Sequence, residues 1–387
     1  MNSLVQLLRH RRYFAPAWVF ASLNIMIGTW VLYIPRVKDK LQLTDSSLGA
    51  ALFCLGLGTL VALLFSSKII KGIGAGQATR AGILSFAILF VFPLVSPSFL
   101  LLCLSLFLVG IASCFTDIAM NALVSEIEIE DDIHIMSASH GFFSLGGAMA
   151  ALIGYFVIEP LDNPLFHIAG ASCLVVLSNL WLSKEYASIQ LNKQESETRF
   201  SIRLLKPLLG FAIIAFIVMG SEGAIEQWSK LYLEEIVGVF SEKTAGLGFL
   251  SFSALMALGR FFGDGLSKRL GAHKVIIGGI LLALLGYFGV LIASQWATIL
   301  GFGVIGLGFS VVIPELLRLA GKTKGITSAE GISVVAGAGF IGFLVSPPFV
   351  GFVADIFTLK GSFTALTIAA GLAFVVSFLI NTVNRNS

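Results

Sequence analysis

The stretch that decides the fold is 106–130, LFLVGIASCFTDIAMNALVSEIEIE, an apolar run about as long as a membrane-spanning helix. Its second half carries Asp117 and, one helical turn later, Asn121, before a dense acidic run that is predicted to be a loop. A carboxylate at the centre of a bilayer helix costs roughly 2.5 to 3.5 kcal/mol on insertion scales. Because that cost is seldom carried without a use, Asp117 is the first candidate for a functional residue.

Composition places the chain in the bilayer. It is 57% hydrophobic and 12% charged, with a mean hydropathy of +0.94, whereas soluble proteins have about 25% charged residues. The apolar runs are long and continuous, which favours helices over a β-barrel. The net charge of +3 is small and dispersed, so no nucleic-acid partner is expected. The four cysteines lie inside apolar runs without metal-ligand spacing, so we expect no disulfide and no metal site.

The chain begins with a basic head and an apolar run at 14–34, which is long enough to be an uncleaved first span. About twelve spans are predicted, near 14–34, 46–66, 80–96, 98–124, 136–158, 165–183, 207–229, 244–265, 274–293, 297–319, 329–353 and 362–383. A charged cytoplasmic linker at 184–206 separates them into two bundles of six, 1–183 and 207–387.

The basic residues predict the orientation. If the N-terminus is cytoplasmic, 19 of the 25 Lys and Arg residues fall in inside segments and 6 in outside segments. The positive-inside rule then places both termini in the cytoplasm.

A glycine-rich basic segment, GRFFGDGLSKRLGAHK at 259–274, lies at the turn between the eighth and ninth spans. Glycines let two helix ends approach closely, and an acid there can pair with a basic side chain or a helix N-terminus. Such a cluster can hold two helices together in one state and release them in another. We therefore predict a gating role for Arg260, Asp264, Arg269 and Lys274, and for Arg318 near the inner end of span ten.

At this segment the chain resembles the major facilitator superfamily, whose signature cytoplasmic loop has this pattern after the second span and often again after the eighth. The first copy here, SSKIIKGIGAGQATR at 66–80, has the glycines and basic residues but no acid. The resemblance covers the whole chain through span count, linker and loop placement. It implies an all-α integral membrane protein with the major facilitator fold, about twelve transmembrane helices in two six-helix bundles.

Within the superfamily the chain resembles the fucose permease-like branch. The patterns that carry this resemblance are WVLYIPRVKDKLQLTDSSLGAALF at 30–53, DIAMN at 117–121, SHGFFSLGG at 139–147, EGAIEQWSKLYL at 222–233 and SPPFVGFVAD at 346–355. These patterns are of moderate specificity.

The resemblance implies a central cavity lined mainly by spans one, four, seven and ten and opened alternately to each side. Polar residues on these spans are therefore the candidates for substrate binding: Asn24, Trp30, Tyr33, Asn121, Glu226, Gln227, Trp228 and Glu315. Asp117, Glu222 and His140 are the candidates for proton coupling, and the fucose permease-like family uses an acid on span four for protons.

These functional assignments have structural alternatives. Asp117 and Asn121 could form a hydrogen-bond cluster that packs span four, and Trp228 could be an interfacial aromatic residue. Glu315 and Arg318, at i and i+3, could form a salt bridge with each other instead of a ligand site. His140 could cap or pack a helix.

We therefore expect a secondary active transporter that moves a small polar solute, a sugar or sugar-like compound, with protons by symport and alternating access. The alternatives are a proton-coupled efflux antiporter for amphipathic or drug-like compounds, and a non-transporting receptor or assembly protein. The sequence has no ATP-binding motif, so the energy for transport is expected to come from an ion gradient. It shows no soluble domain, which removes most enzymatic options, so neither an enzyme nor a cofactor is expected. The expected partners are the solute, protons and the lipid bilayer, around a monomer in a bacterial inner membrane.

Overall fold

The computed structural model describes residues 3–191, 205–323 and 326–386, and over those residues its regular structure is entirely helical. Twelve helical segments in the described part are long and apolar enough to cross a membrane. In the bilayer core every backbone N–H and C=O needs a partner, and a long helix supplies partners within itself. The structure thus confirms the predicted fold class of about twelve transmembrane helices.

The chain separates into two compact units, 1–195 and 196–387. Unit 1 contains α1 (Ser3–Arg9), α2 (Arg11–Val31), α3 (Ile34–Leu41), α4 (Asp45–Leu63), α5 (Ser66–Ile73), α6 (Ala75–Leu89), α7 (Phe92–Val95), α8 (Phe99–Asp131), α9 (Met136–Val157), α10 (Pro164–Leu182) and the short 3₁₀ helix η1 (Ser183–Glu185). Unit 2 contains α11 (Leu205–Glu235), α12 (Glu242–Leu270), α13 (Ala272–Leu291), α14 (Gln295–Phe309), α15 (Val312–Ala320), α16 (Ser328–Ile356) and α17 (Leu359–Asn386).

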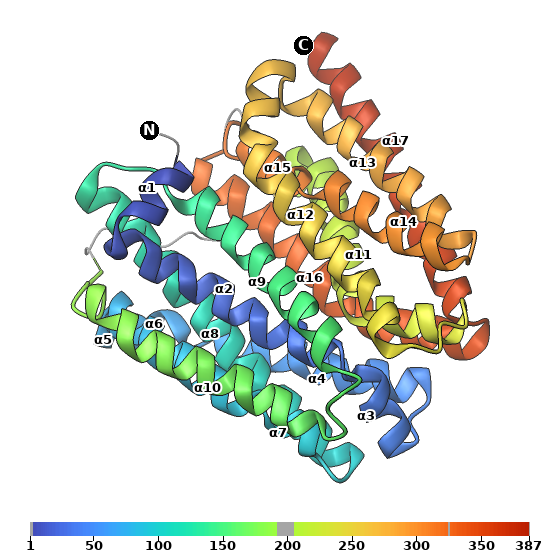
Figure 1. Cartoon of the computed structure of the whole chain (residues 1–387). Helices are drawn as coiled ribbons and strands as arrows, with labels where there is room; N and C mark the ends of the chain where they lie inside the picture. Colours follow the sequence, from blue (N-terminus) through green and yellow to red (C-terminus); the bar gives the residue numbers. More distant parts are fainter. Residues whose placement is uncertain (1–2, 192–204, 324–325, 387) are drawn as a thin grey trace. The chain divides into compact units, whose positions relative to one another are not determined.

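The two units use the same packing scheme (Figure 1). In unit 1, α2 packs along α9, α8 packs on α4 and α6, and α10 covers α2 and α6. In unit 2, α11 packs along α16, α14 packs on α12 and α13, and α17 covers α11 and α13. Each helix of unit 1 that takes part in this scheme therefore has a counterpart at the same place in unit 2.

Close helix crossings repeat between the units. A Cβ added to Gly146 of α9 would overlap the backbone oxygen of Ala21 on α2, and a Cβ added to Gly342 of α16 would overlap the backbone oxygen of Phe216 on α11. Small residues at such crossings let two membrane helices approach closely. Ala21 and Phe216 are thus equivalent positions of an internal repeat.

A second crossing follows the same pattern. Gly110 of α8 lies against the backbone oxygen of Leu55 on α4, and Gly306 of α14 lies against that of Phe252 on α12. Leu55 and Phe252 are therefore equivalent as well. The two crossings thus align α2 with α11 and α4 with α12, residue by residue.

The acidic run at 126–132 departs from its prediction as a loop. Helix α8 continues to Asp131, so most of the run forms its last turns, and Glu126 is only 7% exposed. Arg12 at the start of α2 donates to Glu130 at 2.6 Å and to Asp131 at 2.8 Å. Glu128 accepts from the backbone N–H of Met136 at the start of α9. These contacts let the helix extend through a charged sequence, because the carboxylates are satisfied by neighbouring elements.

The predicted linker begins as packed structure. Tyr186 is fully buried, and the backbone oxygen of Ile189 accepts from the N–H of Gly76 at the start of α6. Gly74, at the turn before α6, has φ +88, a conformation that favours glycine, and the Gln190 side chain lies against it. The rest of the linker at 192–204 lies outside the described residues, so its cytoplasmic position stays a prediction.

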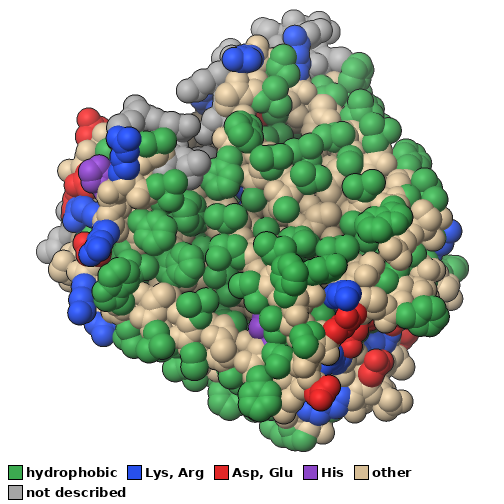
Figure 2. All heavy atoms as spheres, in the orientation of Figure 1, with side chains coloured by type: hydrophobic (Ala, Val, Ile, Leu, Met, Phe, Trp, Pro, Cys, Tyr) green, Lys and Arg blue, Asp and Glu red, His purple; other side chains and the backbone are tan. Residues whose placement is uncertain are grey.

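Large apolar side chains cover the sides of the helices. Figure 2 shows hydrophobic side chains over most of the visible surface, with charged side chains gathered toward helix ends. Leu100, Phe166 and Leu177 are 68% exposed or more. Exposure of this extent in a long apolar helix is what contact with lipid tails requires.

Candidate functional site

A line of hydrogen bonds in unit 1 joins Asp117 to the next helix. Asn121 Nδ2 donates to Asp117 Oδ1 at 3.2 Å and to the Asp117 backbone oxygen at 2.8 Å. His140 Nε2 lies 3.1 Å from Asn121 Oδ1, so its N–H donates to that oxygen. The ring of Phe20 on α2 meets the His140 ring edge to face. The structure therefore brings together the three residues Asp117, Asn121 and His140.

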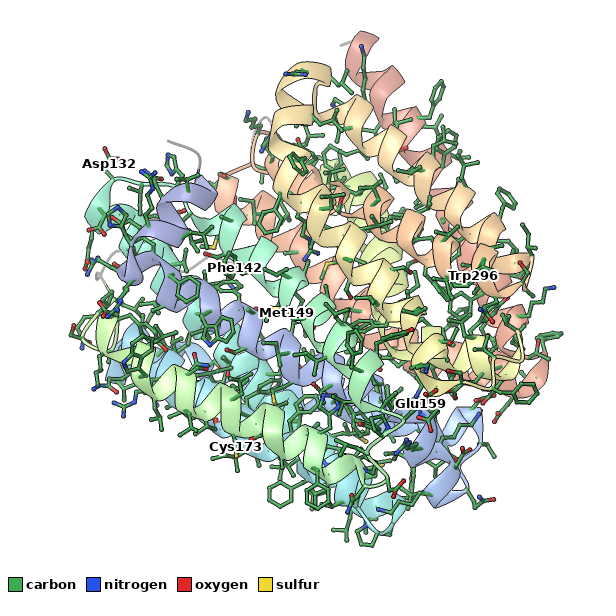
Figure 3. The ribbon with its side chains drawn as sticks, in the orientation of Figure 1. Asp132, Phe142, Met149, Glu159, Cys173 and Trp296 are labelled. Atoms are coloured by element: carbon green, nitrogen blue, oxygen red, sulfur yellow. The ribbon has the colours of Figure 1, made fainter. Side chains whose placement is uncertain are left out.

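His140 lies in the first turns of α9, close to the end marked by Asp132. Figure 3 shows Phe142 and Met149 along this helix, with Asp132 before its start and Glu159 beyond its other end. The Asp117–Asn121–His140 line is thus nearer to the end of unit 1 that carries the acidic run.

Asp117 faces an accessible side of α8 that is not its apolar stripe. Its side chain is exposed, and so is that of His140. Leu104 and Leu108 of the same helix are 51% and 40% exposed. At about 100° per residue, Asp117 lies about 180° around the helix from Leu108 and about 140° from Leu104. Asp117 is therefore accessible on the side of α8 that faces away from the residues that suit lipid.

The substrate-binding candidates of the first span are packed inside unit 1. Asn24 Nδ2 donates to the Phe143 backbone oxygen at 2.9 Å, and Asn24 is 3% exposed. Trp30 is 2% exposed and Tyr33 is 0% exposed. The Tyr33 hydroxyl lies 3.1 Å from His167 Nδ1, a histidine that the sequence analysis did not single out. Direct contact of these residues with a solute stays a prediction, because the present packing encloses them.

A charged cluster lies within unit 2. Glu222 Oε2 on α11 lies 3.7 Å from Arg260 Nη2 on α12, and the two side chains are 17% and 19% exposed. Glu226, one turn further along α11, lies within electrostatic range of both. The structure thus places two acids, one predicted for proton coupling and one for substrate binding, near a basic residue that was predicted to act in gating.

Unpartnered polar atoms surround this cluster. Among the residues that the structure describes, no hydrogen-bond partner meets the geometric criteria for the buried atoms Glu222 Oε1, Ser221 Oγ and Tyr287 Oη. Tyr287, from α13, lies within interaction range of both Ser221 and Glu222. Buried polar groups are rarely left unsatisfied, so such a group indicates an unseen water, an ion or a functional role.

The two other candidates on α11 differ in accessibility. Trp228 is 0% exposed, which agrees with a packing role, and its Nε1 has no hydrogen-bond partner within the described part of the chain. Gln227 is partly exposed, and its Oε1 is buried with no hydrogen-bond partner among the described residues. Of this pair, Gln227 is therefore the one whose side chain is open to a solute in the present conformation.

Glu315 forms a salt bridge within α15. Its Oε1 lies 3.0 Å from Arg318 Nη1, and Arg318 also donates to Ser267 of α12 at 3.2 Å. Glu315 is 2% exposed, whereas Arg318 is 41% exposed. This geometry matches the structural alternative for the pair, and it also ties α15 to the end of α12 where the gate was predicted.

Comparison with protein families settles the family. The model of the Major Facilitator Superfamily matches residues 15–239 and 212–386, which together span nearly the whole chain. The chain belongs to the Major Facilitator Superfamily. It is thus a multi-pass membrane protein of a transporter family.

Curated relatives in the superfamily match along most of their length. An uncharacterized MFS-type transporter of Yersinia pestis is 28% identical over 359 residues, covering 91% of this chain and 92% of the relative. The uncharacterized transporter y4wD of Sinorhizobium fredii is 27% identical, covering 92% and 94%. The membrane protein MosC of Rhizobium meliloti is 27% identical, covering 88% and 83%.

Solved structures show the same fold at low identity. A bacterial homolog of the human lysosomal transporter Spinster, in an inward-facing and occupied conformation, aligns with a TM-score of 0.74 at 14% identity, covering 95% of this chain and 96% of that one. The nucleoside transporter NupG aligns with a TM-score of 0.70 at 15% identity, covering 99% of both chains. At these identities the likeness concerns the superfamily fold alone.

The signature loop of the superfamily is only partly at the turn where it was predicted. Helix α12 continues to Leu270, and the turn itself is made by Gly271 with φ +84. Arg260 is therefore inside the helix, about 15 Å before its end, and not at the turn. Arg269 and Lys274 are exposed on either side of Gly271, and the side chain of Asp264 lies outside the described part. Their gating role stays a prediction.

Besides His167 and Ser221, the sequence analysis did not find Tyr287 or Ser267. Tyr287 stands alone in the apolar run of α13, and Ser267 is an ordinary serine near the end of α12. The hydroxyl of Tyr287 in an otherwise apolar span was the one available signal. The residues that lie beside Tyr287 and Ser267 could not be predicted without knowing which helices of unit 2 pack together.

Proposed function

We propose that this protein is a proton-coupled symporter of a small polar solute, a sugar or sugar-like compound, and that it belongs to the fucose permease-like branch. A proton neutralises Asp117 or Glu222, the solute binds, and alternating access exposes the site to the other side. We propose further that it works as a monomer in a bacterial inner membrane with both termini in the cytoplasm.

One observation carries the proposal, the Asp117–Asn121–His140 line in unit 1. An accessible carboxylate in a membrane span is by default a candidate functional residue, and proton transfer is a common function of such residues. Asn121 lies between the acid and His140, whose imidazole can both accept and donate a proton. The line therefore offers a titratable acid and a second proton-exchanging group joined by one amide.

The experiment has two steps on purified full-length protein. A thermal-shift screen against hexoses, pentoses and polyols at two pH values identifies a solute, because a compound that binds the folded state raises its apparent stability. Uptake of that solute is then measured in liposomes with and without an imposed inward proton gradient. The gradient is expected to stimulate uptake by the parent protein.

Asp117→Asn is the decisive variant, and Asp132→Asn is its matched control. Asp132 is a carboxylate at the end of α8 with φ +52, a conformation that asparagine also tolerates. We expect Asp117→Asn and Glu222→Gln to lose the stimulation by the gradient, while Asp132→Asn keeps it. Gradient-stimulated uptake that is unchanged in both Asp117→Asn and Glu222→Gln would refute the proton assignment, and solute-driven proton export in place of uptake would indicate antiport.

A further inference from the structure

An exposed arginine lies over an exposed tryptophan at the end of unit 1 that carries the N-terminus. The guanidinium carbon of Arg11, the first residue of α2, is 5.3 Å from the centre of the Trp181 ring near the end of α10. Arg11 is exposed, and Trp181 is 58% exposed. In the contact between Arg36 and Tyr33, by comparison, the ring is fully buried. The Arg11–Trp181 pair is therefore open to the surroundings of the protein.

The charge of Arg11 has no acidic partner among the described residues. Its neighbour Arg12 donates to Glu130 and Asp131 at the end of α8, whereas Arg11 contacts α10. The acidic run of α8 is therefore bound on another side of α2. A guanidinium that lies on a ring face keeps its N–H groups in its own plane, where they can donate to a phosphate.

Two more basic residues belong to the same end. Arg9 at the end of α1 and Lys184 of η1 are both exposed, and neither forms an ion pair within the described part of the chain. The acid beside Lys184 is Glu185, which is exposed as well. Figure 2 shows basic side chains at the edge of the molecule where Figure 1 places α1. Three basic residues against one acid give this surface a positive charge.

An apolar stripe on α10 leads to the basic surface. Leu174, Leu177 and Trp181, at i, i+3 and i+7, share one side of the helix and are 47%, 68% and 58% exposed. Lys184 follows three residues after Trp181. Tryptophan is enriched where the bilayer meets water, and apolar side chains below it suit the lipid tails. Along this face the order is thus apolar, aromatic and basic, which matches a phospholipid from its acyl chain to its headgroup.

The start of the chain adds an apolar contact at the same level. Helix α1 packs on α2 and α9 through Leu7, which is 0% exposed, while the next residue, Leu8, is 59% exposed. A short helix with an exposed leucine beside arginines suits the boundary between headgroups and acyl chains. Both α1 and the end of α10 are therefore built for the surface of the membrane.

We propose that Arg11, Trp181 and Lys184 form a binding site for one anionic phospholipid in the leaflet on the N-terminal side. Arg11 and Lys184 bind the phosphate of the headgroup, the Trp181 ring lies at the level of the ester groups, and an acyl chain follows Leu177 and Leu174. Such a site is independent of the solute and of proton coupling.

Tryptophan quenching in vesicles tests the site. The full-length protein is reconstituted in phosphatidylcholine that contains a small fraction of lipid brominated near the headgroup, either phosphatidylglycerol or phosphatidylcholine. Trp181 and Trp296 are 58% and 63% exposed, and the other three tryptophans are less exposed. In Trp296→Phe the quenching therefore reports mainly on Trp181. Basic residues enrich an anionic lipid about fivefold each, so brominated phosphatidylglycerol should quench several times more than brominated phosphatidylcholine.

The reverse variant shows whether the preference is local. Trp181→Phe leaves Trp296, which Figure 3 shows on α14 in unit 2. Both brominated lipids should quench this variant equally. A preference for phosphatidylglycerol of the same size in both variants would refute a site at Trp181.

Charge variants are made in the Trp296→Phe background. Arg11→Gln should bring the quenching by the two lipids close to parity, Lys184→Gln should lower the preference in part, and Glu185→Gln should raise it. Lys322→Gln is the matched control, because Lys322 is an exposed basic residue in unit 2 without an ion pair in the described part. A preference that survives Arg11→Gln and Lys184→Gln, or that falls equally in Lys322→Gln, would overturn the proposal.

A final arm separates a lipid headgroup from free phosphate. Sodium phosphate and sodium chloride at equal ionic strength screen charges to the same extent. The preference for brominated phosphatidylglycerol should be the same in both salts. Its loss in phosphate alone would show that the site takes the free ion in place of a lipid.

Discussion

Glu315 and Arg318 form a salt bridge in which one partner is buried and the other is open to solvent. The carboxylate is 2% exposed and the guanidinium 41% exposed. Losing the exposed partner leaves a buried charge, whereas losing the buried partner leaves a charge that water can solvate. The two halves of the same contact therefore differ in what they contribute to stability.

We expect Arg318→Gln to lower the free energy of unfolding by about 1 to 3 kcal/mol, because it leaves the Glu315 carboxylate buried without its cation. Glu315→Gln should cost less than about 1 kcal/mol, because its partner stays partly solvated. Thermal unfolding midpoints of the purified variants measure both. Equal losses in the two variants would contradict the asymmetry.

At the scale of an element, the α2–α9 crossing shows how a helix pair depends on one small side chain. Gly146 lies against the backbone of Ala21, which cannot move aside as a flexible side chain could. The same contact occurs between Gly342 and Phe216 in unit 2. The position of α9 relative to α2, and so of His140 relative to Phe20, is set at this crossing.

Gly146→Ala should destabilise the protein by about 1 to 3 kcal/mol, since the added methyl group forces the helices apart. Gly170→Ala on α10 is the matched control, because nothing lies within 4 Å of its added Cβ. That control should be neutral or slightly stabilising, as alanine is the better helix former. Unfolding midpoints decide the matter, and similar values for the two variants would contradict the close crossing.

At the scale of the whole molecule, the orientation in the membrane follows from charge and not from packing. The basic residues predict that the Asp132 end of α9 is cytoplasmic and the Glu159 end is outside. Both residues lie beyond the ends of one helix, so they report its direction (Figure 3).

In a variant lacking the four native cysteines, Glu159→Cys should react with a membrane-impermeant maleimide on intact cells. Asp132→Cys should react only after the membrane is permeabilised. Labelling yields on a gel give the answer, and the unmodified cysteine-free protein is the control. The reverse pattern would place both termini outside.

Much of the fold could be predicted because span formation is a local property. The free energy of transferring about twenty apolar residues into a bilayer depends on those residues alone, so the number of spans followed from hydropathy. Helix ends were less predictable. The acidic end of α8 reads as a loop, yet Arg12 and the start of α9 satisfy its carboxylates and allow the helix to continue.

The sequence by itself determined the class, the span count, the family resemblance and the Asp117–Asn121 pair, which one helix brings together through its own period. Only the tertiary structure decided that His140 joins that pair, that Trp30 and Trp228 are enclosed, and that Arg260 stands beside Glu222. Those contacts join different helices, and their geometry depends on which small residues let which helices approach. No local pattern in the sequence contains that information.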